Sequence, residues 1–254
     1  MPLPISPSPV TPDDAPRYYA LVPCAGAGSR AGTASPKQYQ TVAGQPLVMH
    51  TLWALAGVAR LYAGLVVLSP GDDFAWPPGP QWPQRFSRVS CGGESRAHSV
   101  FNGLQALRAS GARDHDWVLV HDAARCLVTS ALVDALIDAC AGDAVGGLLA
   151  LPLPDTLKRA VDGRVAATVP REDKWLAQTP QMFRLGALQQ ALAAQAASGF
   201  AGVTDEASAL EMSGLQPLLV TGSAHNFKVT YPQDFALAQA VLTSRSAVAQ
   251  KEIP

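Results

Sequence analysis

The 254-residue chain has little charge and no long apolar run. Only 15% of its residues are charged and 48% are hydrophobic, so it can bury a large core, which excludes a chain that is disordered throughout. The formal net charge of -1 lacks the basic excess of a protein that coats nucleic acid, so no nucleic-acid partner is expected. No run approaches about 18 apolar residues, so we expect neither a membrane-spanning helix nor a membrane partner. The amino terminus also lacks the features of a secretory signal.

Cysteine is scarce as well. Cys24, Cys91, Cys126 and Cys140 are nowhere at C-x-x-C spacing, which argues against a zinc ribbon or a thioredoxin motif. Scattered thiols in a long chain are typical of small buried side chains in a reducing compartment. We therefore expect a cytoplasmic protein.

Apolar strand-like segments alternate with helical segments of about 12 residues through most of the chain. This alternation is typical of a Rossmann-like α/β fold, in which helices flank a mostly parallel sheet. The segment 152–180 breaks the pattern, and its Asp162-Gly163 dipeptide predicts an antiparallel hairpin. We expect a Pro-rich disordered tail at 1–16, one domain at 17–246 and a carboxyl-terminal tail at 247–254. The predicted strands are 18–23, 64–69, 86–90, 117–121, 144–151 and 217–221, and the predicted helices are 46–59, 96–109, 129–140, 185–197, 205–212 and 232–240.

A Gly-rich loop follows the first predicted strand. Gly26-Ala27-Gly28-Ser29-Arg30-Ala31 formally matches the dinucleotide fingerprint G-x-G-x-x-A. However, no Asp or Glu that could bind a ribose occurs from Thr33 to Gly71, which disfavours a dehydrogenase, and no P-loop register exists. The backbone N–H groups of such a loop can approach phosphates. Arg30 and Lys37 bracket the loop, and their positive charges would offset the negative charge that develops in nucleotidyl transfer. The alternative is a tight turn with a solvated arginine.

Polar residues also follow two later strands. Asp122, in His121-Asp122-Ala123-Ala124-Arg125, comes directly after an apolar strand, where a carboxylate is a natural Mg²⁺ ligand shared with substrate phosphates. A helix N-cap is the alternative, and His121 is expected to be structural. The segment 92–99 is a loop that enters a helix. Its close backbone approach and a serine at the helix start suit recognition of a nucleobase edge, with an ordinary capped turn as the alternative. No zinc-ligand spacing and no G-x-S-x-G elbow occur.

Taken together, several segments resemble the 2-C-methyl-D-erythritol 4-phosphate cytidylyltransferase family. Their order and spacing hold from about Tyr18 to Leu242, and Pro-Lys-Gln-Tyr and Thr-Asp-Glu-Ala are the specific ones. The segments that carry the resemblance are 23–30, 35–39, 92–93, 96–100, 118–125, 155–156, 179–181, 204–211 and 228–230.

The resemblance implies a nucleotidyltransferase-type fold and a transfer reaction. CTP and 2-C-methyl-D-erythritol 4-phosphate (MEP) would give CDP-methylerythritol and pyrophosphate with Mg²⁺, in the non-mevalonate isoprenoid pathway. The MEP phosphate would attack the α-phosphorus of CTP directly, without a covalent enzyme intermediate. Arg30 and Lys37 match the family's transition-state stabilisers, and Asp122 matches its metal-binding carboxylate. The residues that match MEP-positioning groups are Arg125, Arg171, Thr204 and Lys228, and those that match CTP contacts are Ala25, Gly26, Gly28, Gly93 and Ser99.

The resemblance also implies a homodimer, because the family's hairpin arm swaps between two protomers and brings its arginine to the partner's site. Here the arm would span about 152–171. Two departures are visible: Cys126 follows Arg125 where the family usually has Pro, and Tyr231 stands where a charged residue is common. A sister cytidylyltransferase for ribitol 5-phosphate or another polyol phosphate is an alternative, as is a catalytically silent nucleotide-binding protein. No fused second enzyme is expected after the final helix.

Overall fold

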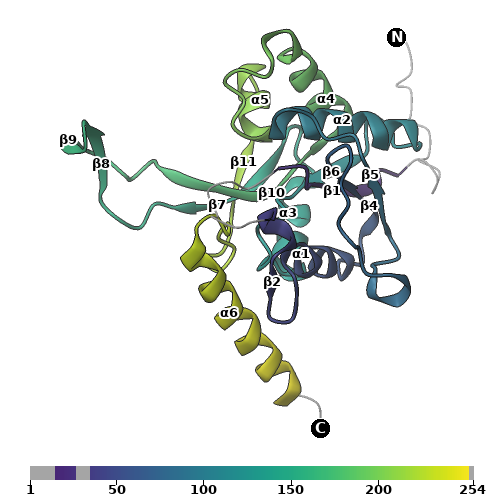
Figure 1. Ribbon diagram of the computed structural model, residues 1–254. Helices are drawn as coiled ribbons and strands as arrows, with labels where there is room; N and C mark the ends of the chain where they lie inside the picture. Colours follow the sequence, from purple (N-terminus) through teal and green to yellow (C-terminus); the bar gives the residue numbers. More distant parts are fainter. Residues whose placement is uncertain (1–14, 27–34, 252–254) are drawn as a thin grey trace, which may run out of the picture.

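The computed structural model describes residues 15–26 and 35–251. A seven-stranded sheet lies at its centre, in the order β11-β7-β10-β6-β1-β4-β5 (Figure 1). Neighbouring strands are parallel except for β10, which runs antiparallel to both β6 and β7. This confirms the predicted mostly parallel sheet. The strands are β1 (Tyr18–Pro23), β4 (Leu61–Val67), β5 (Phe86–Val89), β6 (Trp117–Val120), β7 (Gly146–Pro152), β10 (Trp175–Arg184) and β11 (Leu218–Thr221).

Helices cover both faces of the sheet (Figure 1). Along β1, Ala20 and Val22 pack against α1 (Leu47–Ala56) and α3 (Ser130–Cys140). Tyr19 and Leu21 face the opposite way, into the core formed with α2 (Arg96–Ala109), α4 (Leu185–Ala193) and α5 (Glu206–Met212). Because both faces are buried, the central strands are continuously apolar, as in the Trp-Val-Leu-Val of β6.

Short elements complete the fold. The three-residue helix η2 (Lys37–Tyr39) precedes the small hairpin of β2 (Thr41–Val42) and β3 (Gln45–Pro46), and two further 3₁₀ turns are η3 (Gly79–Gln81) and η4 (Ala196–Ser198).

The last helix, α6, covers Pro232–Lys251, beyond the predicted end at residue 240 and into the segment predicted as a carboxyl-terminal tail. In the described part of the chain, no helix is both long enough and apolar enough to cross a bilayer. The predicted Pro-rich tail falls almost wholly outside the described residues.

Sequence reasoning missed strand β10, which lies inside the sheet between β7 and β6. Pro180 cannot donate to a sheet ladder, which argues against a central strand. The structure accommodates it at a break in register, because the pairing with β7 shifts between Ala177 and Gln181. The pairing with β6 begins only at Gln181, so Pro180 takes no part in either ladder.

The predicted hairpin is present as an arm that extends away from the body (Figure 1). Its strands, β8 (Leu157–Val161) and β9 (Arg164–Val169), pair antiparallel to each other as a separate two-stranded sheet. Asp162 and Gly163 both have positive φ, 50° and 73°, as a type I′ turn requires. The arm emerges where β7 ends and β10 begins, and most of its residues are exposed.

Candidate active site

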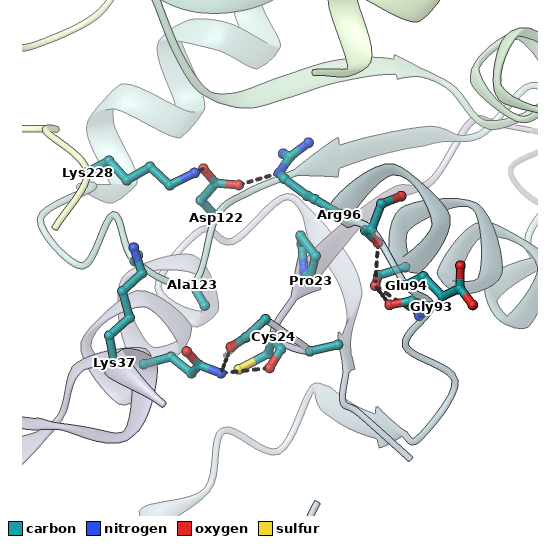
Figure 2. Close-up of a pocket in the computed structure, with 15 residues that line it drawn as sticks. Pro23, Cys24, Lys37, Gly93, Glu94, Arg96, Asp122, Ala123 and Lys228 are labelled. Carbon is teal, nitrogen blue, oxygen red and sulfur yellow. Dashed lines mark hydrogen bonds and ion pairs between the residues drawn. The ribbon is translucent and has the colours of Figure 1, made fainter. Parts of the chain in front are cut away.

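A pocket of about 330 Å³ opens at the carboxyl ends of β1 and β6 (Figure 2). This is the edge where ligands bind in open α/β sheets. Most of the sequence-predicted site residues within the described part of the chain lie on its wall, whereas Gly28 and Arg30 fall outside the described residues. The lining residues are Pro23, Cys24, Ala25, Gly26, Lys37, Gln38, Gly93, Glu94, Ser95, Arg96, Ser99, Asp122, Ala123, Ala124 and Lys228.

Asp122 lies just past the end of β6, after His121, and is buried. Its Oδ1 accepts a hydrogen bond from Arg96 Nε and its Oδ2 accepts one from Lys228 Nζ, each at 2.7 Å. Burial alone would raise the pKa of this carboxyl group, but Arg96 and Lys228 outweigh it and hold the pKa of Asp122 well below its ordinary value. The carboxylate is therefore ionised. The N-cap alternative is wrong, because the next helix begins at Ser130 and its cap is Thr129.

Arg96 links Asp122 to a second buried carboxylate. Its terminal nitrogens donate to both oxygens of Glu206 at 2.7 and 3.0 Å, and the Glu206 side chain is only 1% exposed. Figure 2 shows Lys228, Asp122 and Arg96 in a row along one side of the pocket. Sequence reasoning assigned no role to Arg96 or Glu206. The signal was present, since both lie in segments that carry the family resemblance.

Lys37 enters the pocket from η2, on the side opposite Arg96 (Figure 2). Its Nζ donates to the carbonyl oxygen of Val229 at 2.7 Å, next to Lys228 in the chain. The neighbouring Gln38 is buried and holds the Gly-rich segment in place. Its Nε2 donates to the carbonyl oxygens of Cys24 at 3.0 Å and Gly26 at 2.9 Å. Gln38 is a third residue to which sequence reasoning assigned no role, after Arg96 and Glu206.

The start of α2 forms the remaining wall. Ser95 caps the helix, because its side chain accepts from the backbone N–H of His98, so the capped-turn alternative holds for this residue. Ser99 Oγ accepts from the Gly93 N–H at 3.1 Å and donates to the Ser95 carbonyl oxygen at 2.9 Å. A Cβ on Gly92 would lie 2.3 Å from the Cβ of Ala25, so glycine is needed where these two segments meet. The result is a wall of backbone groups at a helix N-terminus, suited to an anionic nucleotide.

His121 supports the Asp122 backbone from behind the pocket, as expected for a structural residue. The Asp122 N–H donates to Thr179 Oγ1 at 3.0 Å, and the Thr179 hydroxyl lies 3.0 Å from His121 Nδ1. The other ring nitrogen of His121 faces the Arg125 carbonyl oxygen at 3.2 Å. We therefore assign the neutral tautomer with the proton on Nε2. Burial lowers the pKa of His121 to about 4, which keeps the ring neutral.

The other predicted positioning residues are not among the described residues that line this pocket. The Arg125 guanidinium donates to the Asn226 carbonyl oxygen at 2.7 Å and so holds the segment before Lys228. The Thr204 N–H donates to Ser208 Oγ at the start of α5. Arg171 lies at the base of the arm, where it donates to the Pro154 carbonyl oxygen.

The pocket presents cations around one ionised carboxylate, an arrangement suited to a polyphosphate. Among the described residues, no group of three or more His, Cys, Asp and Glu side chains could hold a metal ion by itself. Mg²⁺ does not need such a cage, since it is commonly bound by one or two carboxylates together with substrate phosphates. Each Asp122 oxygen accepts one hydrogen bond in the pairs described above, which leaves further lone-pair capacity on a carboxylate that borders the pocket. The residues present therefore fit a phosphate-shared Mg²⁺.

The family model for 2-C-methyl-D-erythritol 4-phosphate cytidylyltransferase matches residues 18–244. The chain belongs to this family. A 2-C-methyl-D-erythritol 4-phosphate cytidylyltransferase of Chromobacterium violaceum is 56% identical over 231 residues, which cover 89% of this chain and 98% of the relative. A bifunctional enzyme IspD/IspF of Albidiferax ferrireducens is 60% identical over 235 residues. These cover 92% of this chain but 55% of that relative, so this chain spans about half of its length.

Solved structures give the same result for the fold. The crystal structure of a 4-diphosphocytidyl-2C-methyl-D-erythritol synthase superimposes with a TM-score of 0.77 at 39% identity, covering 90% of this chain and 99% of the other. The 2-C-methyl-D-erythritol 4-phosphate cytidylyltransferase of Thermus thermophilus gives a TM-score of 0.72 at 34% identity, covering 89% and 98%. The expected nucleotidyltransferase-type α/β fold is confirmed.

Proposed function

We propose that this protein transfers the cytidylyl group of CTP to MEP, giving CDP-methylerythritol and pyrophosphate in the non-mevalonate isoprenoid pathway. One observation carries the proposal. In a chain of this family, Arg96 and Lys228 pair with the ionised Asp122, and Lys37 lines the same pocket, whose other walls are the segment 23–26 and a helix N-terminus.

The proposed chemistry needs cations rather than a base. An oxygen of the MEP phosphate attacks the α-phosphorus of CTP, and the bond from that phosphorus to the bridging oxygen breaks as pyrophosphate leaves. The nucleophile is already an oxyanion, so no proton has to be removed. The barrier comes from repulsion between anions and from the in-line geometry. Lys37 would offset charge on the reacting phosphates, and Lys228 would hold the acceptor phosphate beside Asp122.

Mg²⁺ is part of this proposal, with Asp122 as its protein ligand. When bound, the cation would neutralise charge on the phosphates of CTP. Asp122 supports the assignment because it is ionised, borders the pocket and stands just past the end of β6. Titration with Mg²⁺ and CTP should show cation-dependent nucleotide binding in the wild type that Asp122→Asn loses. Equal dependence in both proteins would remove Asp122 from this role.

A homodimer is also part of the proposal. The arm carries exposed apolar side chains, Val161 at 53% and Val165 at 68% exposure, which a second copy of the chain would cover. Arg171 lies at the base of this arm and is not among the described residues that line its own pocket, which supports a role for it at the site of a partner. We expect a dimer mass in sedimentation velocity and a monomer mass for the double variant Val161→Asp, Val165→Asp. A wild-type monomer with full activity would contradict this part.

A cytoplasmic location, expected from the sequence because its cysteines suit a reducing compartment, is also part of the proposal. The thiols of Cys24, Cys91, Cys126 and Cys140 are all free in the structure.

The decisive assay is pyrophosphate release from CTP and Mg²⁺, with MEP and ribitol 5-phosphate supplied separately. We expect release with MEP and none above background with ribitol 5-phosphate. The control variant Arg60→Ala removes a cation just before β4, at the other end of that strand from the pocket, and should keep wild-type turnover. Pyrophosphate release only with ribitol 5-phosphate would show that the acceptor is ribitol 5-phosphate and not MEP. CTP binding without pyrophosphate release in the presence of either acceptor would indicate a nucleotide-binding protein that is not an enzyme.

A further inference from the structure

The loop between β4 and β5 lies outside the pocket, yet it packs directly against the turn that carries Lys37. Phe74 from this loop stacks on Tyr39 of η2, with ring centroids 4.0 Å apart and planes within 2° of parallel. Trp76 meets both rings edge-on, at 5.6 Å from Tyr39 and 5.0 Å from Phe74. These three rings form an aromatic cluster in which two members come from the loop and one from η2.

A polar contact fixes the same ring. The Tyr39 hydroxyl donates to the Asp72 carboxylate. Asp72 is itself held in a turn, because its N–H donates to the Ser69 carbonyl oxygen at 3.1 Å and its Oδ1 accepts from the Phe74 N–H at 3.3 Å. Burial, followed by the neighbouring Cys24 and Asp72, raises the pKa of Tyr39, so the phenol keeps its proton and remains a donor.

The far end of the loop is anchored to the edge strand β5. Trp76 contacts Trp82 edge-on at 5.4 Å, and Trp82 Nε1 donates to the Phe86 carbonyl oxygen at 2.8 Å. The Arg88 guanidinium lies over the rings of Trp82 at 4.8 Å and Trp76 at 5.5 Å. Such cation–π contacts hold the rings against the strand. The cluster is therefore attached to the main sheet.

The loop is linked to residues that line the pocket in two ways. Ser69 Oγ donates to the Ala25 carbonyl oxygen at 2.7 Å, which ties the loop to the Gly-rich segment. Tyr39 directly follows Lys37 and Gln38 in a helix of only three residues. The position of the Tyr39 ring thus determines where the backbone of Lys37 lies.

We propose that Asp72 and Phe74 are positioning residues for the transfer reaction. They fix Tyr39, and through it the η2 turn, so that Lys37 Nζ stays at the mouth of the pocket and Gln38 keeps its bonds to the Gly-rich segment. The inference rests on the proposed function for its kinetic readout, and it adds a part of the chain to which the family resemblance gives no role. A displacement of about 1 Å in a group that contacts the reacting atoms costs up to ~10²-fold in rate.

The kinetic test compares Phe74→Ala and Asp72→Ala with conservative partners. We expect kcat to fall roughly 10–100-fold in the alanine variants, with KM for CTP changed by less than about 3-fold. Phe74→Tyr keeps the stack and Asp72→Asn keeps an acceptor for the Tyr39 hydroxyl, so both should stay within about 3-fold of wild type. Should Phe74→Ala not fold, Phe74→Leu keeps apolar volume but removes the ring stack, and a slowed kcat is still expected.

A double-mutant cycle shows whether the loop acts through Lys37. In a Lys37→Ala background, Phe74→Ala should cause a clearly smaller fold-loss of kcat than in the wild-type background, because one of the two groups that it positions is gone. Multiplicative losses would overturn the proposal. The matched control is Tyr62→Ala, which removes an edge contact to Tyr19 at 5.5 Å near the other end of β4, and kcat should be unchanged. An equal loss of kcat in the control would also overturn it.

A labelling measurement keeps this inference separate from the proposed function. Acetylation of lysines by an N-hydroxysuccinimide ester, followed by peptide mass spectrometry, requires no turnover. We expect Lys37 to react at least about 3-fold faster in Phe74→Ala than in wild type, relative to Lys158 on the arm of the same molecule. An unchanged ratio would refute the positioning role even if the enzyme is active. If the wild type shows no turnover but Phe74→Ala still increases the labelling ratio, the proposed function is refuted and the positioning role stands.

Discussion

Replacing Glu206 by Gln perturbs the buried ion pair behind the candidate site while conserving side-chain volume. Glu206 is 1% exposed and accepts two hydrogen bonds from Arg96, whose Nε donates to Asp122. The amide has one acceptor where the carboxylate has two, and its NH₂ group must face a guanidinium that only donates. Arg96 then keeps one anionic partner in place of two.

The expected loss of stability follows from the burial of the pair. Removing one partner of a buried ion pair costs about 3–5 kcal/mol. The Arg96 side chain is 27% exposed and borders the pocket, where water can compensate in part, so we take the lower end, about 3 kcal/mol. For a chain of this length, that corresponds to a fall of roughly 6–12 °C in Tm.

Urea unfolding followed by tryptophan fluorescence measures this loss directly, since the chain has five tryptophans. The control is Asp134→Asn, which makes the same change in a surface pair with Arg60 whose side chains are 41% and 37% exposed. Exposed pairs contribute about 0–1 kcal/mol. A loss for Glu206→Gln no larger than that for Asp134→Asn would refute the assignment of Arg96 and Glu206 as a buried supporting pair.

Three further predictions concern single residues around the pocket. Burial depresses the folded-state pKa of His121 to about 4, below the ordinary value of about 6.5, so between these pH values the unfolded chain binds a proton that the folded chain does not. Stability should therefore fall by on the order of 3 kcal/mol as the pH drops from about 6.5 to about 4. In pH-dependent urea titrations, His121→Gln should give a flatter profile. Lys37→Ala should lower kcat by ~10²–10³-fold in the pyrophosphate-release assay, and near-normal turnover would exclude its catalytic role. Gly92→Ala places a Cβ 2.8 Å from the Leu68 carbonyl oxygen and 2.3 Å from the Ala25 Cβ. The variant should therefore lose about 1–3 kcal/mol of stability and bind CTP more weakly in calorimetry. Wild-type stability together with wild-type CTP affinity would show that the segments carrying Gly92 and Ala25 can separate freely.

The sequence predicts the parallel part of the fold well because its strands are continuously apolar and its helices have clear starts. The helix predicted at 96–109 is observed with the same ends, since Ser95 gives an unambiguous N-cap. β10 carries no such pattern. Its polar and prolyl centre is explained only by the register break against β7, which is a contact between segments far apart in the chain.

The site shows the same division between local and distant information. Lys37, Asp122 and Lys228 could be predicted because each lies in a short segment with a recognisable pattern. The role of Arg96 depends on Glu206, which lies 110 residues away in the chain, and no local pattern specifies that pairing. Long-range partners of this kind become visible only when the fold has brought the two helices together.

The arm is a continuation of two neighbouring sheet strands rather than a separate attachment. β7 and β10 pair up to Pro152 and Trp175, and the Leu153 N–H still donates to the Lys174 carbonyl oxygen at 2.9 Å beyond them. The chain therefore leaves the body and returns to it at the same place. Replacing residues 154–173 with a two-residue turn would convert β7 and β10 into an ordinary hairpin and leave the main core untouched. The arm is thus an insertion whose sequence the body's packing does not constrain, and its length and composition can change without refolding the nucleotide pocket.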